Sequence, residues 1–224
     1  MEQSAIHQLI QQGHYEKALE ACFNNIEAHP DQVENYINSG ILLSEAGEIE
    51  KAERFFQRAL TLKPDNGVIY YNFANVYFNE NRFQEAIKFY QTAIQKGLEN
   101  KDINYMIGMS FHHLDAKKQA LPYLMRAAEL DKNFKDLEIQ FQYGLLLCEL
   151  EMFQEAISIL NRILKIDKKH ADAQYNVTLA QYMINENIEE AIQGFQQAIE
   201  IDSNHMLSHH ALKTFKMIQS QEEV

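Results

Sequence analysis

A helical hairpin pattern that recurs every 34 residues is the feature that most constrains how this chain can fold. The pattern is clearest over residues 70–94, where apolar side chains recur at i, i+3, i+4 and i+7 in two runs separated by a short polar break. The first run consists of Tyr70, Phe73, Ala74 and Tyr77. Two short amphipathic helices cannot bury their apolar faces alone, so the pattern predicts a core formed by stacking successive copies.

The copies cover nearly the whole chain and keep their register through two small insertions. Residues 135–136 are extra between two copies, and the last internal turn holds one extra residue. The first copy is incomplete at its front, and a final segment has the pattern of a first helix without a second. The predicted repeats are 1–32, 33–66, 67–100, 101–134, 137–170 and 171–205, followed by a capping helix over 206–218 and a frayed tail over 219–224.

Small residues at fixed places in each copy predict that the two helices of a hairpin approach closely, while large apolar residues fill the layer between hairpins. Gly40, Gly108 and Gly144 are such residues on predicted first helices. Pro122 falls within the first few residues of a predicted second helix, where backbone N–H groups lack intrahelical partners. We therefore expect a local adjustment at this proline and no break.

The spaced residues resemble the consensus of the tetratricopeptide repeat family, and in particular its small stand-alone cytosolic members from bacteria. The sixth copy departs most, because it carries Thr178 where other copies carry Gly or Ala. The resemblance implies an all-α, right-handed superhelical solenoid of six helix-turn-helix repeats plus a C-terminal capping helix, in a single domain over 1–224. The matching residues of the second copy are Tyr36, Gly40, Leu43, Ala52, Phe56, Ala59 and Pro64.

Charge and composition narrow the expected partners and compartment. The chain has 32 Asp and Glu against 20 Lys and Arg, a net charge of −12, which argues against a nucleic acid or an anionic membrane surface as the partner. Neither a signal peptide pattern nor a membrane-spanning apolar run is present in the sequence. Cys22 and Cys148 lack CxxC spacing, which favours a reducing compartment. We therefore expect a cytoplasmic protein.

The sequence holds no motif of a catalytic or cofactor site, since P-loop, GxGxxG, nucleophile elbow, HExxH and metal-spaced cysteines are all missing. The adjacent His112 and His113, and the pair His205 and His209, have no carboxylate or Cys at matching spacing to complete a metal site. We therefore expect no enzyme activity, no cofactor and no metal. Cys22 takes the place of a large core residue and is expected to be buried and inert.

The family resemblance implies a ligand-binding groove on the concave side, lined by the first helix of each repeat. One lining position forms a column of large apolar side chains, which give much contact area at low entropic cost. The residue directly after this column position is often asparagine, whose side-chain amide can hydrogen-bond the backbone of a ligand. The predicted ligand-binding residues are Asn38, Ile41, Tyr71, Asn72, Asn75, Phe78, Asp102, Tyr105, Met109, Glu138, Phe141, Leu145, Asp172, Tyr175, Asn176 and Leu179.

The charge of these lining positions indicates the chemistry of the partner. Acids such as Asp102, Glu138 and Asp172 occur among them, whereas Lys and Arg do not. The family's carboxylate clamp for acidic chaperone C-termini needs Lys, Asn and Arg at such positions, so an acidic C-terminus is not the expected partner. The expected partner is a basic or neutral, partly apolar segment. A solvated acidic face and generic repeat consensus are the alternative interpretations.

These observations favour a non-catalytic adaptor that binds one or more cytosolic proteins through an extended or helical segment in the groove. Two other classes remain open from the sequence. One is a scaffold that assembles with copies of itself. The other is a regulatory subunit that switches a partner enzyme, for which Lys135 and Asp136 are the candidate hinge.

Overall fold

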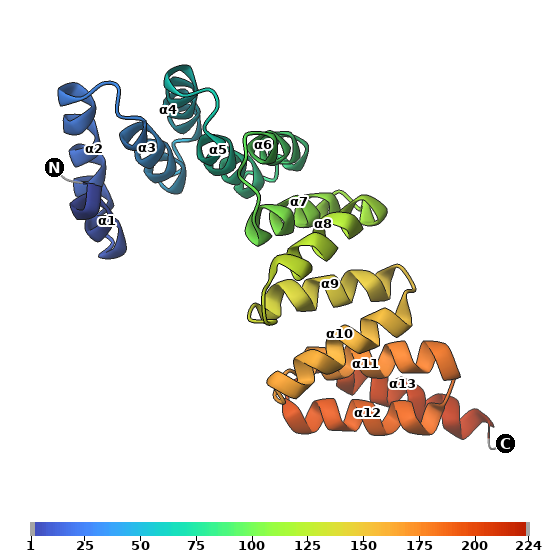
Figure 1. The fold of residues 1–224 in the computed structure, drawn as a ribbon. Coiled ribbons are helices and arrows are strands. Elements are labelled where there is room, and N and C mark those ends of the chain that lie inside the picture. Colours follow the sequence, from blue (N-terminus) through green and yellow to red (C-terminus); the bar gives the residue numbers. More distant parts are fainter. Residues whose placement is uncertain (1–2, 223–224) are drawn as a thin grey trace. The chain divides into compact units, whose positions relative to one another are not determined.

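The computed structural model describes residues 3–222, in which thirteen α-helices occur and no strand (Figure 1). The chain divides between α7 and α8 into two compact units, one up to Leu114 and one from Asp115 onward. The first unit contains α1 (Gln3–Gln11), α2 (Tyr15–Ala28), α3 (Val33–Glu45), α4 (Ile49–Leu62), α5 (Gly67–Asn79), α6 (Phe83–Gln95) and α7 (Lys101–His113). The second contains α8 (Lys117–Leu130), α9 (Leu137–Glu149), α10 (Phe153–Ile166), α11 (Ala171–Asn185), α12 (Ile188–Ile201) and α13 (Met206–Glu222).

The helices pack in consecutive pairs, as the repeat pattern predicts. Each first helix from α3 to α11 begins at the residue predicted to open its repeat. In the first unit α1 packs on α2, α3 on α4 and α5 on α6; in the second, α9 packs on α10, α11 on α12, and α13 covers α12. The prediction of an all-α solenoid of helix-turn-helix repeats is therefore confirmed, whereas a single domain over 1–224 stays a prediction.

The C-terminal helix α13 begins at Met206, where the capping helix was expected to begin, but it extends to Glu222. The prediction of a frayed tail over 219–224 is therefore wrong for residues 219–222, which continue the helix. Residues 223–224 lie outside the described part of the chain.

Close helix contacts depend on single small residues inside the hairpins. A Cβ atom on Gly40 would lie 2.6 Å from Cε2 of Phe56, which is fully buried and stacks on Phe73 of the next hairpin at 5.1 Å between centroids. A Cβ atom on Gly144 would lie 2.9 Å from Cδ2 of Leu160. The small residue thus fixes the spacing within a hairpin, and its large partner carries the contact to the next.

The sixth repeat keeps this close contact, but the small residue lies on the second helix and its larger partner on the first. Thr178 on the first helix occupies the space that a Cβ atom on Gly194 of the second helix would need. Both residues are buried. The departure from consensus at Thr178 is therefore compensated by a glycine on the facing helix.

The turn inside each hairpin contains one residue with left-handed φ. In sequence order these residues are Gly13, Gly47, Asn81, Asp115, Glu151 and Glu186. Glycine adopts this conformation without steric cost, and asparagine at little cost. Glu151 and Glu186, with φ of 60° and 54°, hold it against the preference of their side chains.

The inserted residues before α9 form an anchored turn. The carboxylate of Asp131, 6% exposed, accepts the backbone N–H of Asp136 at 3.0 Å and Nε2 of Gln140 at 3.2 Å. Phe134 is buried beneath the guanidinium of Arg162, whose Cζ lies 4.1 Å from the ring centroid. The hinge predicted at residues 135–136 is therefore not supported, and the division between the units falls at 114/115 instead. Helix α8 continues through Pro122 as expected.

Replacing Gly40 by alanine is expected to lower the free energy of unfolding by about 1–2 kcal/mol, although alanine favours a helix interior by roughly 1 kcal/mol. The new methyl group would overlap the buried ring of Phe56. Urea unfolding followed by circular dichroism measures the change.

The substitution Phe56→Leu provides the matched control, because it removes the ring atoms that the methyl group would meet. Gly40→Ala should cost less in the Phe56→Leu background than in the wild type. Equal costs in both backgrounds, or a gain in stability from Gly40→Ala alone, would contradict the close-contact interpretation.

Candidate functional site

The sixteen predicted ligand-binding residues, termed here the first-helix face, are divided between the two units. Nine lie on α3, α5 and α7 of the first unit, where Asp102 is exposed and the others are half-buried. On α5 the repeat positions Phe73, Ala74 and Tyr77 are buried, whereas Tyr71 and Asn72 are half-buried. The periodicity therefore separates core positions from surface positions on this helix.

Two asparagines of α5 are oriented by hydrogen bonds within the first unit. The hydroxyl of Tyr90 donates to Oδ1 of Asn75 at 2.6 Å, and Nδ2 of Asn72 donates to the carbonyl of Val68 at 2.8 Å. Burial raises the pKa of Tyr90, so its hydroxyl stays a donor at physiological pH. These bonds use only part of each amide's capacity, which leaves the NH₂ group of Asn75 and Oδ1 of Asn72 for a ligand backbone.

Aromatic rings fill one end of the first-helix face in the first unit. The imidazole of His113 stacks on Phe83 with 4.5 Å between centroids and 6° between planes. Phe78 meets both rings edge-on, at 5.4 Å from Phe83 and 5.7 Å from His113. The three rings are thus in mutual contact.

In the second unit the remaining seven predicted residues lie on α9 and α11, and one of them belongs to the core. Phe141 is only 9% exposed, packs in one cluster with Leu160 and Val177, and lies 4.6 Å from the imidazole of His170. Glu138 is exposed and accepts a hydrogen bond from Nε2 of Gln142 at 2.9 Å. The other members are half-buried, apart from the exposed Asp172.

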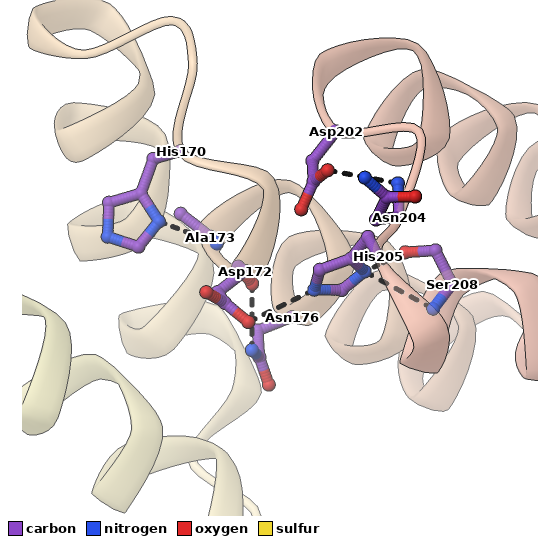
Figure 2. Close-up of polar contacts among 8 residues, drawn as sticks. All are labelled: His170, Asp172, Ala173, Asn176, Asp202, Asn204, His205 and Ser208. Carbon is purple, nitrogen blue, oxygen red and sulfur yellow. Dashed lines mark hydrogen bonds and ion pairs between the residues drawn. The ribbon is translucent and has the colours of Figure 1, made fainter.

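Asp172 contacts a buried histidine that the sequence did not connect with it (Figure 2). Nε2 of His205 lies 3.0 Å from Oδ1 of Asp172, and Nδ1 lies 2.7 Å from the hydroxyl of Ser208 and 3.2 Å from its backbone nitrogen. A backbone N–H can only donate, so Nδ1 accepts and the proton on Nε2 is donated to Asp172. Because Ser208 is the third residue of α13, His205 acts as the N-cap of that helix.

His170 performs the same task one repeat earlier. Its Nδ1 accepts the backbone N–H of Ala173 at 3.3 Å and caps α11, as Figure 2 shows. Asn176 donates from Nδ2 to the carbonyl of Asp172 at 2.8 Å, repeating the geometry of Asn72 on α5. Equivalent asparagines in the two units thus present the same free amide groups.

A cavity of about 250 Å³ opens between α9, the start of α10 and α11; it is called the Cys148 cavity below. It brings together two predicted residues, Asn176 and Leu179, with residues that the predicted set did not include. Burial, with a smaller contribution from Glu149, raises the pKa of Cys148 to about 11, so its side chain is a thiol at neutral pH. The lining residues are Cys148, Glu149, Glu151, Phe153, Asn176, Leu179, Ala180 and Met183.

Two further observations concern other chemistry in the described part of the chain. Cys22 is fully buried, and burial raises its pKa to about 11, in agreement with an inert thiol. Residues 3–222 contain no group of three or more His, Cys, Asp or Glu side chains placed to hold a metal ion. None of the helices over these residues is long and apolar enough to cross a membrane.

Comparison with known proteins identifies the family. Residues 43–106 and 102–134 match family models described as tetratricopeptide repeat. The crystal structure of YrrB, described as a TPR protein with an unusual peptide-binding site, is 38% identical, with a TM-score of 0.78, over 87% of this chain and 99% of that one. No protein with a curated description matches. The chain therefore belongs to the tetratricopeptide repeat family.

More distant structures share the fold. MamA is 20% identical, with a TM-score of 0.68 over 76% of this chain and 92% of its own. PilF of Pseudomonas aeruginosa is 15% identical, with a TM-score of 0.75 over 96% of this chain and 94% of its own. Family membership confirms the predicted resemblance and assigns the protein to the interaction modules that bind other proteins.

Replacing His205 by alanine is expected to lower the free energy of unfolding by about 2 kcal/mol, because α13 loses its cap and a buried ring is removed. His205→Asn should restore part of the loss, since asparagine is a favoured N-cap. Urea unfolding measures both changes. His210→Ala is the matched control, because this ring is exposed, and it should change stability by less than about 0.5 kcal/mol. Equal losses for the alanine and asparagine variants at position 205 would rule out the capping role.

Proposed function

We propose that this protein is a non-catalytic adaptor of the cytosol that binds a basic or neutral, partly apolar segment of a partner protein along its first-helix face. The observation that carries the proposal is that, in each unit taken by itself, the residues of this face include half-exposed aromatic and amide side chains and no Lys or Arg. The peptide-binding site in the description of YrrB, a relative with 38% sequence identity, supports this choice of ligand.

The aromatic residues of the face supply contact area, and their surroundings hold them in place. Tyr71 lies 5.9 Å from the buried ring of Tyr90, and Tyr175 lies 5.5 Å from Phe195 and 5.7 Å from His205, between ring centroids. Side chains that are already ordered lose little entropy when a ligand binds. Tyr71, Tyr105 and Tyr175 are therefore the proposed principal contacts, while Phe141 contributes through the core.

The acids of the face differ in how much charge they offer to a partner. Asp172 already accepts a hydrogen bond from His205. Asp102 and Glu138 are exposed, and no salt bridge links either of them to another described residue. Glu138 accepts a hydrogen bond from Gln142, so Asp102 is the carboxylate best placed to attract basic residues of a partner.

Affinity purification from the native cell tests the proposed face. The triple variant Tyr71→Ala/Tyr105→Ala/Tyr175→Ala is expected to lose partners that the wild type retains, because it removes most of the exposed aromatic contact area. Mass spectrometry of the retained proteins measures the loss, and circular dichroism verifies that the variant is folded.

A second triple variant provides the matched control for this experiment. Tyr15→Ala/Met125→Ala/Ile166→Ala removes exposed apolar side chains from second helices, outside the first-helix face. This control should retain the wild-type partners. If the wild type and both triple variants retain the same partners, the proposed binding face is wrong. Light scattering of the wild type across a concentration range distinguishes self-association from binding to another protein. The exposed Met206 and Met217 of α13 are the alternative contact surface for self-association.

An acidic peptide that ends like a chaperone C-terminus is expected to bind more weakly than micromolar at physiological salt. The first-helix face carries carboxylates and no basic side chain to pair with those of the peptide. Isothermal titration calorimetry measures the affinity. Micromolar or tighter binding that survives physiological salt would contradict the proposed partner chemistry.

A further inference from the structure

We propose that the Cys148 cavity is the anchor pocket for one lysine or arginine side chain of the partner segment. The inference rests on the proposed function, since it names the side chain that one part of the first-helix face receives. Ligand pockets for whole small molecules span roughly 300–1,000 Å³. The cavity of about 250 Å³ is therefore of a size for a single side chain.

The less exposed part of the lining is mainly apolar, and the exposed part contains two carboxylates. Ala180 is buried, and Cys148, Phe153 and Leu179 are half-buried, whereas Glu149, Glu151 and the apolar Met183 are exposed. A lysine or arginine has the same division, with an aliphatic stem and a charged head. A purely apolar side chain would contact the apolar part but would desolvate the carboxylates without compensating their charge.

Glu151 is the carboxylate on which the proposal depends. Glu149 is already 3.5 Å from Nζ of Lys117, so part of its charge is compensated. Glu151 enters no hydrogen bond or ion pair that involves its side chain with another residue in the described part of the chain. No lysine or arginine lines the cavity. A cation from a partner would therefore be the first charge to pair with Glu151.

The equivalent place in the first unit holds packed rings and no carboxylate. The repeats of the two units align with an offset of 70 residues, which sets Phe78 against Cys148 and His113 against Met183. There Phe78, Phe83 and His113 pack against one another. The neutral Asn81, with φ of 57°, stands where Glu151 has φ of 60°. The cavity thus exists because Cys148 is smaller than Phe78, and it carries a negative charge because Glu151 stands in place of Asn81. The same fold accommodates both arrangements.

Thiol–disulfide exchange at Cys148 tests the charge preference without a known partner. The protein is equilibrated with equal amounts of cystamine and hydroxyethyl disulfide. Cystamine transfers a group that ends in an ammonium, and hydroxyethyl disulfide transfers a group of similar size that ends in a hydroxyl. Peptide mass spectrometry gives the ratio of the two adducts at Cys148. The thiol exchanges slowly because its pKa is raised, so the ratio is read at equilibrium.

The variant Glu151→Asn reproduces the residue at the equivalent place in the first unit and keeps a side chain that tolerates left-handed φ. It should lower the ratio of aminoethyl to hydroxyethyl adduct by about two- to fivefold relative to the wild type. Glu186→Asn is the matched control, because it removes the same charge from the same kind of turn, outside the cavity. The control should leave the ratio unchanged. An unchanged ratio in Glu151→Asn, or an equal fall in both variants, would overturn the proposal.

Partner capture with Cys148→Phe then separates this proposal from the proposed function. The new ring is expected to fill the cavity as Phe78 fills the equivalent place, and to lose at least one partner that the tyrosine triple variant also loses. If Cys148→Phe is folded and keeps every such partner, the anchor role is wrong while the first-helix face stands. If the tyrosine triple variant keeps all partners, the proposed function fails and the anchor role with it.

Discussion

The close approach of two helices across one small residue is the contact on which the rest of the structure depends. Gly40 admits the ring of Phe56, and Gly144 admits Leu160. Because this contact sets the spacing and rotation of each first helix, the residues that face away from the second helix recur at the same positions in every repeat. The surface available for a ligand is therefore a consequence of how the core is packed.

Much of the fold follows from the sequence because its determinants are local. Helix starts, capping turns and apolar faces repeat every 34 residues, and the start of each first helix from α3 to α11 was predicted from that spacing. The departure of the sixth repeat from the consensus, in contrast, depends on a contact between two helices. Thr178 and Gly194 exchange the small and large roles, and such a pairing is visible only when the facing helices are seen together. The length of α13 also escaped the pattern, since no further repeat marks its end.

The candidate site could be predicted as a set of positions but not as a set of contacts. Helical register indicates that Tyr71 and Asn72 lie at the surface, and the structure leaves both half-buried. Register carries no information about contacts between repeats, so the partnership of Asp172 with His205 was missed. The Cys148 cavity was missed because a cavity depends on which neighbouring side chain is short. One signal was nevertheless present, since the turn residues change from Gly47 through Asn81 and Asp115 to Glu151 along the chain.

A repeated surface gives every repeat similar contacts, so selectivity must come from the places where the repeats differ. General acidity raises the rate at which basic segments are encountered, but it does not fix their register. A register needs a position at which only one kind of side chain fits. The aromatic cluster around Phe78 closes one such position, and the cavity beside Cys148 opens the equivalent one. In the proposed adaptor, the tyrosine and asparagine positions would then contribute most of the contact area, while this difference between equivalent sites would align the bound segment.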